Sequence, residues 1–340
     1  MERESLIGAS GRGVALGTLR ERTRSGFTDG SLGQRRVGGR ISKALCSGGL
    51  LAAILAPALN GQDPALRQEA AAPQPSSSVT VVENVPYGVV NGVELRLDVY
   101  ESPSQGAHPG VLLFHGGGWS GLDKGTMRRM GEFLGRSGFV AFSVDYRLLQ
   151  GTENAWPAQL DDAQRAVRWV RANAATYHVD GARIGAFGHS AGAQLAALLG
   201  LEDTRDNSDP SLAKFSSRVQ AVVDVSGPTD FTADQDSDGA LFLARFLGGD
   251  YAHRPDVWRD ASPVFHVSRE SAPFLIVHGM EDDNVPISQA QQLFEKLQSA
   301  GVAVSFVKVD DGHTFRTPDA RRQLAFETLA FFERHLVAPR

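Results

Sequence analysis

The chain has 340 residues, of which 42% are hydrophobic and 21% charged, and this composition suffices for one sizeable core. Residues 1–60 carry nine Lys and Arg against four Asp and Glu, whereas the remainder carries 25 against 35. The globular part is therefore acidic, which argues against nucleic acid as a partner.

Residues 1–60 have the pattern of a leader. Four basic residues between positions 35 and 43 precede an apolar run, Ala44–Leu59, which is too short to span a bilayer. Ala56-Pro57-Ala58 then offers small residues at a cleavage spacing. We expect a signal peptide and export to the periplasm or the exterior. The alternative is an uncleaved amphipathic or membrane-anchoring segment.

Two features of this N-terminal part bear on the processed protein. Residues 61–78 are rich in Pro, Gln, Ala and Ser and predict a flexible linker. The single cysteine, Cys46, lies in the apolar run. After cleavage the chain would therefore have no disulfide, no thiol nucleophile and no stable membrane span.

From residue 79 to 340 apolar strand patterns alternate with helical patterns, which predicts an α/β fold with a mostly parallel sheet and helices on both faces. The expected strands are Val81–Tyr87, Glu94–Tyr100, Val111–His115, Phe139–Asp145, Arg183–Gly188, Val219–Ser226, Phe274–His278 and Val304–Asp310. The expected helices are Gln159–Tyr177, Ala193–Gly200, Ile287–Ala300 and Arg321–Leu336. Residues 228–272 exceed a simple crossover and predict a small lid-like insertion. Active sites in such sheets form at the carboxyl ends of the strands.

The first motif at such a strand end is His115-Gly116-Gly117-Gly118-Trp119. Consecutive glycines allow the backbone to approach a ligand closely and to point several N–H groups at one place. An acyl-transfer enzyme needs such donors where the oxyanion forms. The alternative is a merely flexible glycine loop.

The second motif is Gly188-His189-Ser190-Ala191-Gly192, between an apolar strand and a helix of small residues. Glycines two residues either side of a serine fit a sharp strand-to-helix turn that exposes the hydroxyl. The N–H of Ala191 would be a further oxyanion donor.

A carboxylate and a histidine follow later strands. Asp282 and Asp283 lie in the loop after Phe274–His278, and chemistry alone does not choose between them. His313 lies just beyond the last strand, at the sheet edge expected for Ser190. Asp230 follows the strand after the serine and is a third candidate for the acid. The chain order Ser, Asp, His is that of the α/β-hydrolase triad.

Residues 85–336 resemble the α/β-hydrolase esterases, closest to hormone-sensitive-lipase-like carboxylesterases and the adjoining feruloyl and acetyl-xylan esterase branch. The resemblance rests on the two glycine motifs and three other segments, which are Asp145-Tyr146-Arg147-Leu148, Pro157 through Trp169, and His278-Gly279 with Asp282, Val285-Pro286 and Gly312-His313. It implies an α/β-hydrolase fold with an eight-stranded sheet. It also implies Ser190 as nucleophile, His313 as base and Asp282 as acid, with Gly117, Gly118 and Ala191 as the oxyanion donors.

Four other residues have expected roles around the pocket and the glycine loop. Trp119 and His189 are expected to line the substrate pocket. Tyr146 and Arg147 are expected to brace the glycine loop.

The resemblance implies an exported serine carboxylesterase that needs no cofactor. The expected substrates are short-chain or aryl esters, including acetyl or feruloyl esters of polysaccharide. The alternatives are a prolyl-oligopeptidase-like peptidase and an inactive hydrolase-fold binding module. The histidines lack metal-ligand spacing, so we expect no metal site, and the oligomeric state stays open.

Overall fold

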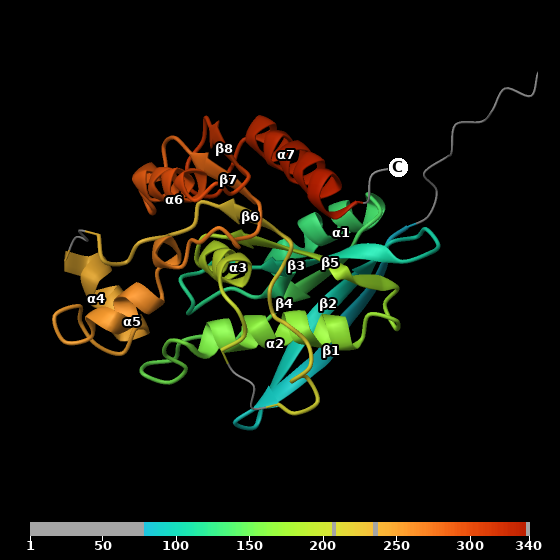
Figure 1. Ribbon diagram of the computed structural model, residues 1–340, viewed down its shortest axis with the longest axis horizontal. Coiled ribbons are helices and arrows are strands. Elements are labelled where there is room, and N and C mark those ends of the chain that lie inside the picture. Colours follow the sequence, from blue (N-terminus) through green and yellow to red (C-terminus); the bar gives the residue numbers. More distant parts are fainter. Residues whose placement is uncertain (1–77, 206–208, 234–236, 338–340) are drawn as a thin grey trace, which may run out of the picture. The chain divides into compact units, whose positions relative to one another are not determined.

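The computed structural model describes residues 78–205, 209–233 and 237–337 (Figure 1). The predicted signal peptide (1–60) and all but the last residue of the predicted linker (61–78) lie outside the described residues. Among the described residues, no helix combines the length and apolar character needed to cross a bilayer.

Eight strands of the described chain form one sheet, in the order β1-β2-β4-β3-β5-β6-β7-β8. Their bounds are β1 Thr80–Val90, β2 Val93–Glu101, β3 His108–Phe114, β4 Val140–Val144, β5 Val179–His189, β6 Ala221–Val225, β7 Phe274–Gly279 and β8 Val304–Val309. Strand β2 pairs antiparallel with both β1 and β4, and every other pairing is parallel. The predicted strands and the mostly parallel sheet are confirmed.

Helices cover both faces of the sheet, and the apolar residues of the strands explain why. The helices are α1 Arg128–Arg136, α2 Ala158–Ala172, α3 Ala191–Leu201, α4 Ser237–Phe246, α5 Pro255–Asp260, α6 Ile287–Ser299 and α7 Pro318–Leu336. Helices α1 and α7 bury apolar side chains in one core cluster. Helices α2, α3 and α6 bury theirs in a second, larger cluster. Strands covered on both faces are buried along their whole length and rich in apolar residues, as β3 and β4 are here.

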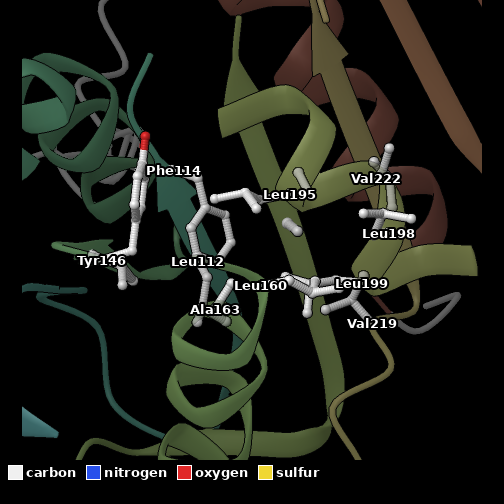
Figure 2. Packing of buried hydrophobic residues seen from close by; sticks show 14 of the residues in the cluster. Leu112, Phe114, Tyr146, Leu160, Ala163, Leu195, Leu198, Leu199, Val219 and Val222 are labelled. Carbon is white, nitrogen blue, oxygen red and sulfur yellow. The ribbon is translucent and has the colours of Figure 1, made fainter. Parts of the chain in front are cut away.

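Helix α3 is the packing centre of the larger cluster. Figure 2 shows Leu195, Leu198 and Leu199 of α3 among the buried side chains of the neighbouring strands and of α2. All three are fully buried, and each contributes roughly 2 kcal/mol of apolar burial. The helix that follows the predicted nucleophile is therefore held rigidly against the sheet.

Two differences from the sequence prediction concern helices. The helix expected to end at Tyr177 ends at Ala172, and Asn173 caps it while its side chain donates to the carbonyl of Trp169. Helix α1 was not predicted, because Gly131 and Gly135 lower its helix propensity. A Cβ at Gly131 would collide with the ring of Tyr100, so the glycine permits a close helix–sheet contact.

Candidate active site

Ser190 lies at the turn between β5 and α3. Its backbone has φ 55° and ψ −123°, a conformation that costs of order 1–3 kcal/mol for a residue with a side chain. The turn is closed by crowding, since a Cβ at Gly188 would collide with the backbone of Gly192, and a Cβ at Gly192 with that of Phe114. The Ser190 N–H donates to the carbonyl of Val225 at 2.8 Å. Small residues and this bond hold the serine in its strained geometry.

The structure joins Ser190, His313 and Asp282 in one chain of hydrogen bonds. Oγ of Ser190 lies 2.9 Å from Nε2 of His313, and Nδ1 of His313 lies 2.8 Å from Oδ2 of Asp282. The ionised carboxylate only accepts, so Nδ1 carries the proton and Nε2 is free to accept the proton of Ser190. This arrangement can make a serine hydroxyl nucleophilic.

Four donors surround the Asp282 carboxylate. Oδ1 accepts the backbone N–H groups of Asn284 and Val285 at 3.0 and 2.9 Å. Oδ2 accepts from His313 and lies 3.2 Å from Nε2 of His278. Burial alone would raise the pKa of Asp282, but these hydrogen bonds outweigh burial and hold the pKa well below its usual range. The side chain therefore stays ionised through the neutral range.

The other two candidate acids lie elsewhere. Asp283 is exposed, and no hydrogen bond joins it to His313 in the described chain. The carboxylate of Asp230 accepts from Gln292 and Thr232 instead. Of the three carboxylates that the sequence left open, Asp282 is the one that contacts His313.

The glycine loop after β3 lies against this group. Gly117 and Gly118 have φ +99° and +56°, and a Cβ at Gly117 would collide with the carbonyl of Gly121. Among the residues that the structure describes, no acceptor pairs with the N–H of Gly117 or Gly118. A Cβ on Gly116 would lie 3.1 Å from the Cβ of Ser190, so the loop touches the serine turn. The loop thus offers unpaired donors beside Ser190.

Neighbouring residues fix the shape of this loop. The hydroxyl of Tyr146 donates to the carbonyl of His115 at 2.8 Å, and the two rings stack 4.3 Å apart. The N–H of Leu149 donates to the carbonyl of Trp119 at 2.8 Å. Arg147, expected to brace the loop, instead pairs with Asp162 of α2 at 2.8 Å. Tyr146 and Leu149 therefore brace the loop, and Arg147 ties their segment to a helix.

A pocket of about 520 Å³ opens above Ser190 and His313. The predicted insertion 228–272 supplies part of its wall. The lining from this insertion and from α4 includes Pro228, Asp230, Phe231, Ala233, Gly239, Phe242 and Leu243. The opposite wall is formed by the loop that begins α6. The lining is mostly apolar and also includes polar side chains such as Asp230, Asn284 and Gln289.

Trp119 and Phe242 form the aromatic end of this pocket. Trp119 stacks on Phe246 at 4.1 Å between ring centroids and is 3% exposed. The ring tip of Phe242 reaches the glycine loop, since a Cβ on Gly118 would lie 3.1 Å from its Cζ. Phe242 therefore closes the pocket beside the unpaired N–H groups.

His189 lines the pocket on the other side of Ser190. Its Nε2–H donates to the backbone carbonyl of His313 at 2.9 Å, and the two rings lie 5.1 Å apart. Burial, together with the nearby charge of His313, lowers the pKa of His189. A neutral His189 holds the backbone of His313 without competing for its proton.

Sequence reasoning missed two buried polar residues at the site. Gln194 of α3 accepts from Nε1 of Trp119 at 3.0 Å and donates to the carbonyl of Ala261 at 2.8 Å. It therefore ties the glycine loop to the insertion. In the sequence His278 is only a member of the motif that contains Asp282, whereas in the structure its Nε2 contacts the Asp282 carboxylate. Within the described ranges, no cluster of three or more His, Cys, Asp or Glu side chains is arranged to hold a metal ion.

Comparisons with known proteins bear on the family and the fold of this chain. The model of the BD-FAE family matches residues 97–297. Esterase LipQ of Mycobacterium tuberculosis is 32% identical over 242 residues, which cover 68% of this chain and 56% of that protein. Probable carboxylic ester hydrolase LipM of the same organism is 31% identical, over 62% of this chain and 50% of its own length. This chain thus spans about half the length of the curated relatives it matches.

A solved structure described as a truncated form of a carbohydrate esterase from gut microbiota superposes with a TM-score of 0.65 at 28% identity. The match covers 76% of this chain and 96% of the other. The expected α/β-hydrolase fold is confirmed.

Proposed function

Because this chain belongs to the BD-FAE family and has the α/β-hydrolase fold of esterases, we propose that it is a serine carboxylesterase. The observation that carries the proposal is the hydrogen-bonded chain from Ser190 through His313 to Asp282 at the floor of a pocket. The names of LipQ and LipM as esterase and probable ester hydrolase support it.

The reaction follows from the positions of the protons. His313 Nε2 takes the proton of Ser190 Oγ as that oxygen attacks the ester carbonyl, and Asp282 stabilises the imidazolium that results. The N–H groups of Gly117, Gly118 and Ala191 would bind the oxyanion. His313 then gives its proton to the departing alcohol, and water attacks the acyl-enzyme by the same steps in reverse order.

The acyl group is short in this proposal. Phe242 stands against the glycine loop, where the acyl chain of a bound ester would extend beyond the oxyanion donors. A ring fixed at that place leaves room for acetyl or similar small groups. The structural neighbour described as a carbohydrate esterase supports an ester carried on a carbohydrate. Feruloyl esters would need Phe242 to move aside.

Export belongs to the proposal as well, and it rests on the leader pattern in residues 1–60. Expression of the full chain in a bacterial host, followed by fractionation and N-terminal sequencing, tests it. A mature N-terminus near Ala58 outside the cytoplasm is expected, and an uncleaved chain retained in the cytoplasm would contradict it.

The activity is tested with nitrophenyl acetate, butyrate and octanoate and with acetylated xylan. We expect turnover of the acetate and butyrate esters that Ser190→Ala abolishes. A Ser190→Ala protein that folds and keeps wild-type turnover would overturn the proposal. Hydrolysis of a peptide substrate without ester hydrolysis would favour a peptidase instead.

A further inference from the structure

A second buried histidine stands behind the Asp282 carboxylate. His278 occupies the carboxyl end of β7, and its side chain is completely buried. Its Nε2 lies 2.8 Å from the carbonyl oxygen of Val285, which can only accept, so Nε2 carries a proton. The same Nε2 lies 3.2 Å from Oδ2 of Asp282. One N–H is therefore shared between a backbone carbonyl and the carboxylate.

This contact matters because the two oxygens of Asp282 are held differently. Two backbone N–H groups of its own loop fix Oδ1. Among the described residues, Oδ2 has two partners, His313 on the pocket side and His278 on the core side. The bonds to Oδ1 restrain Oδ2 indirectly through the planar carboxylate, and His278 is the donor that holds Oδ2 directly from the core side.

A buried carboxyl lies on the same face of the sheet as His278 and interacts with it electrostatically. Asp224 of β6 pairs with Ile276, two residues before His278, so its side chain projects from the same face of the sheet. The carboxyl of Asp224 is wedged under the serine helix, since a Cβ on Gly227 would lie 2.6 Å from its Oδ1 and 2.8 Å from Ala193. Within the described chain, Nδ1 of His278, Oδ2 of Asp224 and Oγ of Ser226 have no hydrogen-bond partner. The residues behind the acid thus bury polar atoms whose hydrogen-bonding capacity is not fully used.

The charges around His278 are those of the site itself. Asp224 faces it from β6, and Asp282 faces it from the loop after β7. His313 and His189 lie beyond the carboxylate, and His278 and His189 interact electrostatically. The charge of His278 also opposes the rise that burial causes in the pKa of Asp224. His278 therefore interacts with two acids, Asp282 and Asp224.

We propose that His278 is a positioning residue for catalysis, which acts through Asp282 by donating Nε2–H to Oδ2 on the core side of the carboxylate. The inference rests on the proposed function, because it assigns a part in the same serine hydrolysis. His278 touches neither the pocket nor Ser190 in the described structure. Its contribution is to keep the Asp282 oxygen where His313 needs it.

A purely structural role is the competing explanation, since the bond to Val285 also closes the loop that carries Asp282. The experiment therefore compares His278→Gln, whose amide can donate near the position of Nε2, with His278→Phe, which fills the space but cannot donate. Ile276→Val in the same strand is the control for altered packing. All variants are assayed on nitrophenyl acetate, with thermal unfolding measured alongside.

We expect His278→Phe to lower kcat about tenfold with KM within about twofold, the effect of one lost hydrogen bond to a charged group. The pH of half-maximal kcat/KM should rise, because all the charge of Asp282 then acts on His313. His278→Gln should restore most of kcat, and Ile276→Val should leave kcat and the pH profile unchanged. In an Asp282→Asn background, His278→Phe should have no further effect on kcat.

A His278→Phe protein with wild-type kcat and pH profile would overturn the inference, as would an equal loss of kcat in the Asp282→Asn background. If His278→Phe does not fold, His278→Gln and His278→Asn decide, because the shorter Asn amide does not reach Oδ2. Equal kcat in these two would also overturn it. An inactive wild-type protein would instead remove the proposed function, so the two failures are distinguishable.

Discussion

Replacement of Asp224 by asparagine should change how the stability of this protein depends on pH. Asp224 is 1% exposed. Burial raises the pKa of its carboxyl from the ordinary 3.8 to about 6, against the opposing effects of His278 and of the Gly227 N–H. The difference between these two values, at about 1.4 kcal/mol per pH unit, corresponds to about 3 kcal/mol.

The direction of this pH dependence follows from which state of the protein, folded or unfolded, binds the Asp224 proton more tightly. The folded protein holds the Asp224 proton up to about pH 6, whereas the unfolded chain releases it near pH 3.8. The stability that Asp224 contributes is therefore complete below pH 3.8 and is lost as the pH rises through 6. Asparagine does not titrate, so its contribution stays constant over this range.

Urea denaturation of wild type and Asp224→Asn between pH 3.5 and 8 measures the effect. As the pH rises across this range, the free energy of unfolding of Asp224→Asn minus that of wild type should increase by up to about 3 kcal/mol. The steepest increase should fall between pH 4 and 6. Asp283→Asn, the same substitution at an exposed aspartate, serves as the matched control. A stability difference between Asp224→Asn and wild type that is constant with pH would refute this account of the buried carboxyl.

Three further predictions concern activity. Asp282→Asn should lower kcat by about 10³–10⁴-fold through loss of the correct His313 tautomer, whereas Asp283→Asn should stay within about twofold, and equal losses in nitrophenyl acetate hydrolysis would contradict the assignment. Phe242→Ala should raise the ratio of kcat/KM for nitrophenyl octanoate over acetate by about 10–100-fold, because removal of the ring opens space in which the added methylenes of octanoate make apolar contact. An unchanged ratio would show that Phe242 does not limit the length of the acyl group. Tyr146→Phe removes the donor to the His115 carbonyl and should cost about 1 kcal/mol of stability in urea denaturation, with a several-fold loss of kcat; a variant as stable and active as wild type would mean that Tyr146 does not brace the glycine loop.

The features that follow local rules could be predicted from the sequence. Strands β3 and β4 are rich in apolar residues, and each of the predicted site loops follows a strand. The turn at Ser190 is dictated by Gly188 and Gly192, whose backbones leave no room for a side chain. Ser190, Asp282 and His313 each follow a parallel strand, and this places all three at one edge of the sheet.

The remaining features depend on contacts between distant segments. Local propensity does not predict α1, because Gly131 is favourable only against the ring of Tyr100 and Gly135 only against the side chain of Val79. Gln194 is an ordinary helix residue until Trp119 and Ala261 meet its amide. The contact of His278 with Asp282 arises because the loop after β7 turns back, so that both Asp282 and Val285 meet the imidazole. These polar contacts are set by tertiary packing, which no single segment encodes.

The proposed role of Ser190 as the nucleophile of a serine esterase can be tested chemically. The test uses a fluorophosphonate probe, which reacts with activated serines, followed by peptide mass spectrometry. We expect one probe per chain on the peptide that contains Ser190, no label on Ser190→Ala, and loss of esterase turnover in proportion to labelling. A label on another residue, or full turnover by a labelled protein, would contradict the account.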